Sequence, residues 1–401
     1  MRALTHFVGG EHVAGTSGLF GDVFNPNTGK VQARVPLATA AEVDAAIANA
    51  ATAQVAWAAA NPQRRARVMF EFKRLLERDM QELAELLSSE HGKVVADSKG
   101  DIMRGLEVIE FACGIPHLTK GEYSQGAGPG IDVYSMRQPL GVVAGITPFN
   151  FPAMIPMWMM GPAIACGNAF ILKPSERDPS VPVKLAELLM EAGLPAGVLN
   201  VVHGDKVAVD ALLDNPTVKA VSFVGSSDIA QAVYARGSAN GKRMQCMGGA
   251  KNHGVILPDA DFDQAVADIM GAAYGSAGER CMALPVVATV GEKTAAIMRE
   301  KLVDAISTLR VGVSSDTDAH FGPVVSAAHK AKIEGYIQMG VDEGAELVVD
   351  GRGFSLQGHE DGFFVGPTLF DRVTPQMKSY KDEIFGPVLQ MMRAETFEEA
   401  L

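Results

Sequence analysis

From Gly141 onward, short apolar segments alternate with segments of helical character, and this alternation constrains the fold of the 401-residue chain more than any other feature. A strand–helix repeat of this kind predicts a parallel sheet with helices on both faces. Ligands bind such a sheet beyond the carboxyl ends of its strands. The expected strands cover 142–146, 169–172, 198–202, 220–223 and 243–247, and the expected helices 152–166, 180–192, 205–214 and 227–239.

The chain divides into three regions by its patterns. A second α/β pattern begins after Lys251, with expected helices near 292–309 and 326–343 and strands near 346–349 and 363–370. Ahead of the sheet, short strands and turns are expected over 7–40, then helices over 40–60, 62–90 and 97–117. Residues 123–140 alternate and are rich in glycine, which predicts a projecting hairpin. The predicted domains are therefore 1–122 with 142–250, the hairpin 123–141, and 251–401.

Composition excludes several kinds of partner. The formal net charge is −12 and no basic stripe offsets it, which argues against nucleic-acid binding. The four cysteines lack CxxC spacing and the nine histidines form no ligand cluster, so neither a metal nor a disulfide framework is expected. The apolar run at 154–165 is interrupted by prolines and predicts a buried helix rather than a membrane span. With no signal pattern at the N-terminus, a cytoplasmic protein is expected.

Residues 275–283 place one cysteine, Cys281, in a loop of small residues directly after Arg280. A thiolate is the nucleophile in cysteine chemistry, and a neighbouring cation lowers the pKa of the thiol. The small residues leave room for a substrate. The alternative is a buried free cysteine that fills a gap in the core, as is expected for Cys113 and Cys166.

Three further segments, 148–152 (PFNFP), 223–226 (FVGS) and 383–388 (EIFGPV), accompany the cysteine loop. In this order the four segments resemble the aldehyde dehydrogenase superfamily, from about residue 7 to the chain end. The resemblance implies a parallel-sheet NAD-binding domain over 1–122 and 142–250, and an oligomerisation hairpin over 123–141. It also implies a catalytic α/β domain over 251–401, and a homodimer or homotetramer.

The NAD site implied by the resemblance lacks the GxGxxG fingerprint. Instead, a strand over 220–224 leads through Gly225 and Ser226 into a helix, whose N-terminal N–H groups suit a pyrophosphate. Alone, this could be a simple capped turn. The resemblance implies that Lys173 binds the adenosine ribose, that Glu383 holds the nicotinamide ribose and that Phe385 packs near the ring. The remaining members of the predicted cofactor set are Thr147, Phe149, Glu176, Arg177 and Gly248.

Asn150 is the predicted oxyanion donor. It lies between prolines that fix the backbone, so its amide and the Cys281 backbone N–H would stabilise the oxygen formed when sulfur attacks a carbonyl. The alternative is an N-cap role at the following helix.

Residues 245–252 depart from the hydrolytic enzymes of this superfamily. A glutamate there activates water, whereas this chain has Met247 or, with the glycines aligned, Cys246. Hydrolysis of an acyl-enzyme should therefore be slow, and the thiol of coenzyme A (CoA) could release the acyl group instead. Residues 249–253 and 280–284 resemble the CoA-acylating methylmalonate-semialdehyde dehydrogenase branch.

That branch binds a substrate carboxylate, which guanidinium groups bind through paired hydrogen bonds. Arg280 and Arg104 match its two arginines; the alternatives are an Arg280–Glu279 pair and an exposed helix charge at Arg104. The expected reaction is NAD-dependent oxidation of methylmalonate or malonate semialdehyde through a Cys281 thioester, with decarboxylation and transfer to CoA. Two alternatives stay open. One is a hydrolytic enzyme that uses Glu383. The other is an inactive fragment, since 395–401 resembles the middle of a helix and family members continue further.

Overall fold

The computed structural model describes residues 2–401 and divides them into two compact units. The first unit contains 2–23, 32–86 and 99–248, and the second contains 24–31, 87–98 and 249–401. The division after Gly248 lies close to the boundary expected near residue 250. Segments 24–31 and 87–98, which were expected in the first domain, belong to the second unit.

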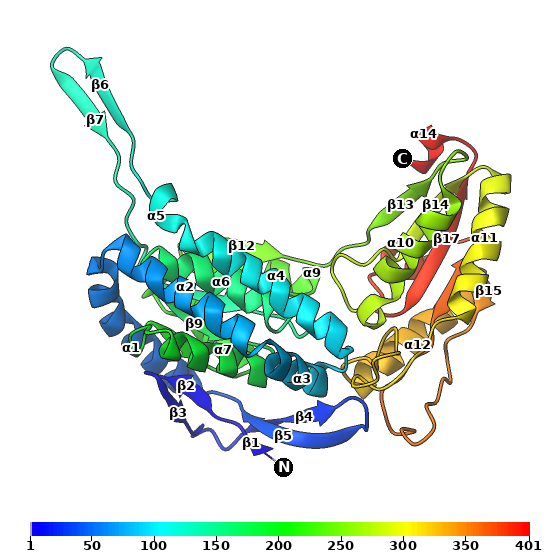
Figure 1. Cartoon of the computed structure of the whole chain (residues 1–401), viewed down its shortest axis with the longest axis horizontal. Coiled ribbons are helices and arrows are strands. Elements are labelled where there is room, and N and C mark those ends of the chain that lie inside the picture. The colour runs from blue at the N-terminus through cyan, green and yellow to red at the C-terminus, as the bar shows by residue number, and fades with distance from the viewer. Residues whose placement is uncertain (1) are drawn as a thin grey trace. The chain divides into compact units, whose positions relative to one another are not determined.

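A seven-stranded sheet with strand order β12-β11-β8-β9-β10-β2-β3 forms the centre of the first unit (Figure 1). The five strands from β8 to β12 pair in parallel, as predicted. The N-terminal strands β2 and β3 extend one edge in the antiparallel direction, which was not predicted. The bounds are β2 His6–Val8, β3 Glu11–Val13, β8 Val142–Ile146, β9 Ala169–Lys173, β10 Leu199–Val201, β11 Val218–Val224 and β12 Arg243–Met247.

Helices cover both faces of this sheet, because alternate residues of each strand face opposite sides. Along β8, Val142, Ala144 and Ile146 join the core formed with α1, α8 and α9, whereas Gly145 lies against Met159 of α6. The helices are α1 Ala40–Ala59, α2 Pro62–Arg78, α3 Met80–His91, α4 Val95–Cys113, α5 Ile115–Leu118, α6 Met154–Ala165, α7 Ser180–Glu191, α8 Lys206–Asp214 and α9 Ser227–Ala239.

Two expected helices are each divided in the structure. The helix expected over 62–90 is interrupted at Asp79, whose backbone (φ −100°, ψ 12°) leaves the helical region between α2 and α3. The helix expected over 97–117 is interrupted at Gly114, and Pro116 then lies in the first turn of the short helix α5. Proline lacks the N–H that a continuous helix needs at this point.

Two smaller sheets complete the N-terminal part of the chain. Strands β1 Arg2–Ala3, β5 Lys30–Pro36 and β4 Phe20–Asn25 form a three-stranded sheet in the order β1-β5-β4. Strands β6 Tyr123–Gly128 and β7 Ile131–Tyr134 pair antiparallel, and Figure 1 shows them as a hairpin that projects from the first unit. The hairpin predicted over 123–140 is therefore confirmed.

A five-stranded sheet with strand order β13-β14-β17-β16-β15 forms the second unit. All neighbours pair in parallel except the edge strand β15. The expected strand at 346–349 is confirmed as β15, whereas that at 363–370 is reduced to β16. The bounds are β13 His253–Ile256, β14 Val286–Val290, β15 Glu346–Val349, β16 Thr368–Asp371, β17 Val388–Ala394, α10 Phe262–Tyr274, α11 Glu292–Ser307, α12 Ala327–Asp342, α13 Lys378–Lys381 and α14 Phe397–Ala400.

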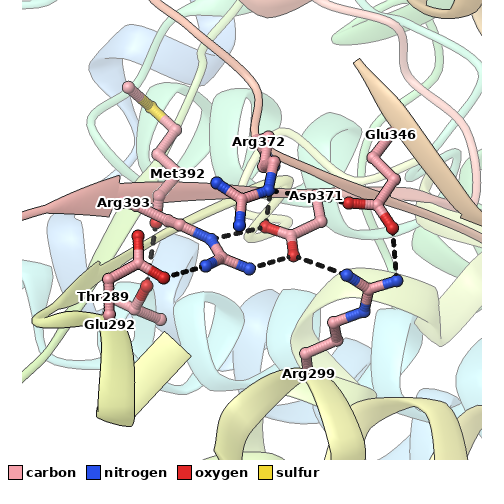
Figure 2. Close-up of polar contacts among 8 residues, drawn as sticks. All are labelled: Thr289, Glu292, Arg299, Glu346, Asp371, Arg372, Met392 and Arg393. Carbon is pink, nitrogen blue, oxygen red and sulfur yellow. Dashed lines mark hydrogen bonds and ion pairs between the residues drawn. The ribbon is translucent and has the colours of Figure 1, made fainter. Parts of the chain in front are cut away.

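An ion network closes the carboxyl edge of this second sheet (Figure 2). Asp371 is fully buried at the end of β16 and accepts hydrogen bonds from Arg393 (2.5 Å) and Arg299 (3.3 Å). Arg299 also donates to Glu346 (2.5 Å), and Arg393 pairs with Glu292. The carboxyl edge of this sheet is therefore occupied by ion pairs between arginines and carboxylates.

Within residues 2–401, no helix is both long enough and apolar enough to cross a membrane.

Candidate active site

Four neighbouring strands of the first unit end at one edge of its sheet, and the predicted cofactor residues of this unit follow those ends. Strand β8 pairs with both β9 and β11, so the strand order reverses beside it, which makes this edge the expected ligand crevice of a parallel sheet. The group, here named the cofactor edge, comprises Thr147, Phe149, Asn150, Lys173, Glu176, Arg177, Gly225, Ser226 and Gly248.

The chain after β8 and the end of β9 bring five of these residues together. The backbone N–H of Thr147 donates to the carbonyl of Lys173 (3.1 Å). The Thr147 hydroxyl is buried without a hydrogen-bond partner, and a buried polar group of this kind is normally satisfied by a ligand or water. The Arg177 guanidinium lies over the Phe149 ring, with Cζ 4.9 Å from the ring centroid. The Lys173 side chain is buried, and its ammonium lies 3.4 Å from Glu176.

The loop after β11 exposes a helix N-terminus. Helix α9 begins at Ser227, and the side chain of its N-cap residue, Ser226, makes no capping hydrogen bond. A Cβ on Gly248 would lie 3.0 Å from Ser227, so only glycine fits there without a shift. A helix N-terminus without a side-chain cap, a buried unpaired hydroxyl and close backbone approach fit a dinucleotide at this edge.

Asn150 is almost completely buried in the same loop. Helix α6 begins at Met154 with Ala153 as its N-cap residue, so the alternative role of Asn150 as N-cap is wrong. Asp101 instead accepts the hydrogen bond from the N–H of Met154 (2.7 Å).

The second unit contains a pocket, here named the cysteine pocket, that includes the predicted nucleophile. Cys281 lines it together with Arg280, Glu383 and Phe385, and all of them are within the second unit. Its other lining residues are Ala250, Ala273, Gly278, Ala283, Pro285, Ile384, Gly386 and Val388. Pro285 and Val388 mark the amino ends of β14 and β17, so the pocket lies at the sheet edge opposite the ion network.

Hydrogen bonds from side chains to the backbone fix the position of the cysteine loop in this pocket. The Asn252 side-chain amide donates to the carbonyls of Cys281 (2.9 Å) and Ala283 (2.8 Å). Glu383, the one carboxylate among the residues that line the pocket, accepts a hydrogen bond from the N–H of Ala250 (3.2 Å). Cys281 is half-buried, in contrast to Cys113, whose thiol is buried and has its pKa raised by that burial. The expectation that Cys113 belongs to the core is confirmed.

The two predicted substrate arginines belong to different units. Arg280 pairs with Asp97 (Nη2 to Oδ1, 2.8 Å), so the alternative pairing with Glu279 is wrong. Arg104 lies on α4 of the first unit with 67% of its side chain exposed and pairs with Glu107 (3.0 Å). The position of Arg104 on the helix agrees with the alternative that it is an exposed helix charge. Both arginine side chains are partly exposed.

No carboxylate replaces the missing base at the end of β12. Met247 is the last residue of the strand and is exposed, and Cys246 is half-buried with the pKa of its thiol raised by burial. A protonated thiol and a thioether are poor general bases.

Sequence reasoning missed Asp97 and Asn252. Asp97 holds the cysteine loop, because its second oxygen accepts the N–H of Ser276 (2.9 Å) while the first binds Arg280. It lies about 180 residues earlier in the chain, and no local pattern indicates this pairing. Asn252 follows the glycines of the motif at 248–252, so its motif position was a signal, although its role as a donor required the fold.

Comparisons with known proteins agree with these features. A family model described as "Aldehyde dehydrogenase family" matches residues 12–401. A malonate-semialdehyde dehydrogenase of Pseudomonas aeruginosa is 56% identical over 401 residues, covering 100% of this chain and 80% of that protein. The acylating mitochondrial methylmalonate-semialdehyde dehydrogenase of Arabidopsis thaliana is 50% identical over 396 residues, covering 99% of this chain and 65% of that protein.

Two solved structures are similar over the whole chain. One is a Sinorhizobium meliloti 1021 protein named for methylmalonate-semialdehyde dehydrogenase and complexed with NAD; its TM-score is 0.99 and its identity 61%, and 82% of that protein is covered. The other is the methylmalonate-semialdehyde dehydrogenase of Oceanimonas doudoroffii, with a TM-score of 0.98, 52% identity and 82% coverage. Both alignments cover 100% of this chain.

Proposed function

Because the chain belongs to the aldehyde dehydrogenase family, we propose that it oxidises methylmalonate or malonate semialdehyde with NAD and transfers the acyl group to CoA. The names of two similar relatives support this substrate class. One structural observation supports the CoA-dependent outcome: the cysteine pocket has a nucleophile, but the position of the usual water-activating glutamate is occupied by Met247 or Cys246.

The reaction begins at sulfur. The Cys281 thiolate attacks the aldehyde carbon, and the carbonyl oxygen becomes the oxyanion of a thiohemiacetal. The side-chain amide of Asn150 and the backbone N–H of Cys281 would donate to that oxyanion. NAD, when bound, supplies a hydride acceptor for this carbon, and loss of the hydride leaves an acyl thioester on Cys281.

The release steps return the enzyme to its starting state. The carboxyl group β to the thioester leaves as carbon dioxide, and the resulting carbanion takes up a proton to give a propionyl thioester, or an acetyl thioester from malonate semialdehyde. The thiolate of CoA then attacks the thioester carbonyl and displaces the Cys281 thiolate. Water competes poorly, because the pocket offers one carboxylate, Glu383, and the N–H of Ala250 already binds it.

The cofactor edge supplies the groups that would hold NAD. The N-terminus of α9 suits the pyrophosphate, with Gly225 and Gly248 allowing close approach. Lys173 and Glu176 would bind the adenosine ribose, with Thr147, Phe149 and Arg177 beside it. Glu383 and Phe385 of the second unit would contact the nicotinamide ribose and ring.

Arg280 and Arg104 would bind the substrate carboxylate. The Arg280 guanidinium lines the cysteine pocket and has one side engaged by Asp97, which orients it and leaves other donors available.

For the two units and the hairpin, we propose that the first unit binds NAD and that the second carries out catalysis. The hairpin β6–β7 would form the contact between subunits of a homodimer or homotetramer. Tyr123, Ile131, Val133 and Tyr134 of this hairpin are exposed apolar side chains.

The proposed function is tested by following NADH formation from methylmalonate semialdehyde with and without CoA, and by identifying the acyl product by mass spectrometry. Turnover that requires CoA and yields propionyl-CoA is the expected result. Replacing Cys281 with alanine should abolish NADH formation, whereas the matched variant Cys113→Ala should retain it because Cys113 lies in the core. Full-rate turnover without CoA would instead indicate hydrolysis through another base. Activity in Cys281→Ala would contradict the mechanism.

A further inference from the structure

The segment before Cys281 has an unusual backbone. Ser276, Ala277 and Gly278 adopt consecutive left-handed conformations, with φ of 54°, 53° and 71°. The left-handed conformation is sterically unfavourable for a residue with a side chain, so Ser276 and Ala277 are strained. Such a segment persists only where the surrounding structure holds it. Asp97 accepts the N–H of Ser276 at the start of this segment, and Asn252 binds the carbonyls of Cys281 and Ala283 beyond it. Glu279 provides a third contact between these two points.

Glu279 lies between the strained residues and the nucleophile, and its side chain is completely buried. Its carboxyl group accepts a hydrogen bond from the N–H of Val325 (3.2 Å). Two imidazoles lie beside it, His329 at 3.4 Å and His91 at 3.9 Å. Burial, followed by the charges of Lys93, His329 and Arg280, lowers the pKa of His91 well below its usual value, so His91 is neutral near pH 7. A buried carboxyl group with these contacts is firmly located.

His329 extends this connection to the second strained segment of the pocket. Its Nε2 lies 2.7 Å from the carbonyl of Phe385 and donates to it. Phe385 itself is left-handed, with φ of 63°. The two segments also touch directly, since a Cβ on Gly278 would lie only 2.1 Å from the carbonyl oxygen of Gly386. The Glu279–His329 pair therefore links the backbone that carries Cys281 to the backbone that carries Phe385.

We propose that Glu279 and His329 are positioning residues, which together hold the Cys281 thiol in its reactive placement relative to Phe385. This proposal deepens the proposed function, because Cys281 and Phe385 are the assumed nucleophile and nicotinamide-contacting side chain. Neither Glu279 nor His329 takes part in a bond-forming step. Their effect is to fix the geometry of a strained loop, and a misplacement of about 1 Å can slow a reaction by roughly a hundredfold.

The test measures alkylation of Cys281 by iodoacetamide, located by mass spectrometry on the full chain. The reaction needs neither aldehyde nor cofactor, so it reports on the placement of the thiol even if the proposed substrate is wrong. We expect Glu279→Gln, which keeps the size of the side chain, to slow this alkylation about tenfold or more. The matched control is Asp371→Asn, which makes the same kind of change at another fully buried carboxylate of the second unit. At equal folded fraction, the control should alkylate at the unmodified rate.

A second pair of variants tests the positioning role of His329. His329→Leu removes the donor to the Phe385 carbonyl and should slow alkylation by a similar factor. His329→Gln retains an N–H donor and should restore the rate to within about threefold. Where turnover is observed, Glu279→Gln should lower kcat and leave the KM for the semialdehyde within about twofold. Unchanged alkylation in both Glu279→Gln and His329→Leu would overturn the proposal, as would an equal loss in Asp371→Asn. If Glu279→Gln does not fold, the two His329 variants decide the result.

Discussion

At the scale of single residues, Gly278 combines two constraints within the cysteine pocket. Its backbone is left-handed, with φ of 71°, and the Gly386 carbonyl closes over the place where a side chain would be. Gly353 has a similar φ of 69°, but open space surrounds it. Comparing alanine substitutions at Gly278 and Gly353 separates the cost of the left-handed backbone from the cost of the clash with the Gly386 carbonyl. Only Gly278 lies between two segments of the cysteine pocket.

The first prediction is that Gly278→Ala disables the pocket whereas Gly353→Ala does not. In both variants a left-handed alanine costs roughly 1 kcal/mol. In Gly278→Ala the Gly386 carbonyl must also move, because its oxygen would lie 2.1 Å from the new Cβ. In Gly278→Ala we expect both the alkylation of Cys281 by iodoacetamide and the turnover of the semialdehyde to be about a hundredfold slower. Rates for Gly353→Ala should match those of the unmodified chain. Equal rates in the two variants would show that close packing at Gly278 is unimportant for the nucleophile.

At the scale of elements, the second sheet separates its functions between two edges. The cysteine pocket lies at the amino ends of β14 and β17, while the carboxyl ends of β14, β16 and β17 lead into the ion network of Figure 2. Burial raises the pKa of Asp371, but hydrogen bonds from Arg393 and from the N–H of Arg372, with the charges of Arg393 and Arg299, outweigh burial and lower it overall. The network thus stabilises the charged form of Asp371.

The second prediction follows from this lowered pKa. A carboxyl group whose pKa is lower in the folded state contributes stability above its unfolded pKa, about 3.9. That stability is lost as the pH falls through the folded pKa. Asp371→Asn should therefore lower the free energy of unfolding by about 3 kcal/mol at pH 7, and by less at pH 3. Urea unfolding at both pH values measures this difference, and an equal loss at both would contradict the assigned charge.

The third prediction concerns the start of α1 in the first unit. Thr39 and Glu42 form a capping box, in which the N–H of Glu42 donates to Thr39 Oγ1 (3.2 Å) and the N–H of Thr39 donates to Glu42 (2.8 Å). Thr39→Ala should cost about 1 kcal/mol of unfolding free energy. The control is Thr52→Ala, an exposed threonine within the same helix, which should be neutral or slightly stabilising because alanine is the better helix former. A cost at Thr39 no larger than at Thr52 would mean that the cap is not important for stability.

The elements that could be predicted from sequence are those whose own pattern specifies them. Strands β8 to β12 are short apolar runs between amphipathic helices, and their parallel pairing follows from that alternation. Strands β13, β14 and β17 and helix α10 were not predicted. Five-residue runs such as Val286–Val290 resemble buried helix turns as much as strands when no regular alternation surrounds them. The pairing of β2 with β10 was also missed, because it joins segments nearly 200 residues apart.

The same distinction applies to the candidate site. The residues at the cofactor edge and Cys281 follow strand ends or lie in recognisable motifs, so their sequence positions indicated them. The positions of Asp97 and His329 are fixed only by tertiary contacts, to Arg280 and to the Phe385 carbonyl respectively. Such residues carry no local signal, and a lone aspartate or histidine on a helix is ordinarily a surface residue.

At the scale of the whole molecule, the two units are interleaved along the chain. The chain passes between them after residues 23, 31, 86, 98 and 248. The first four of these five crossings fall inside β4, β5, α3 and α4, and only the last lies in a loop. Unfolding one unit would therefore break hydrogen bonds within elements that the other unit also uses. This connectivity favours a single cooperative transition rather than two independent ones.

The fourth prediction tests that cooperativity with the tryptophans. The chain contains two, Trp57 and Trp158, and both belong to the first unit, so tryptophan fluorescence reports on that unit alone. Far-UV circular dichroism reports on the helices and strands of both. Asp371→Asn changes only the second unit, yet it should lower the urea midpoint by the same amount with either probe, since a cooperative molecule transmits the loss to the first unit. If the units unfold separately, the fluorescence midpoint will stay where it is and the circular-dichroism curve will become biphasic. That outcome would mean that the four shared elements can be divided at their crossings at little energetic cost.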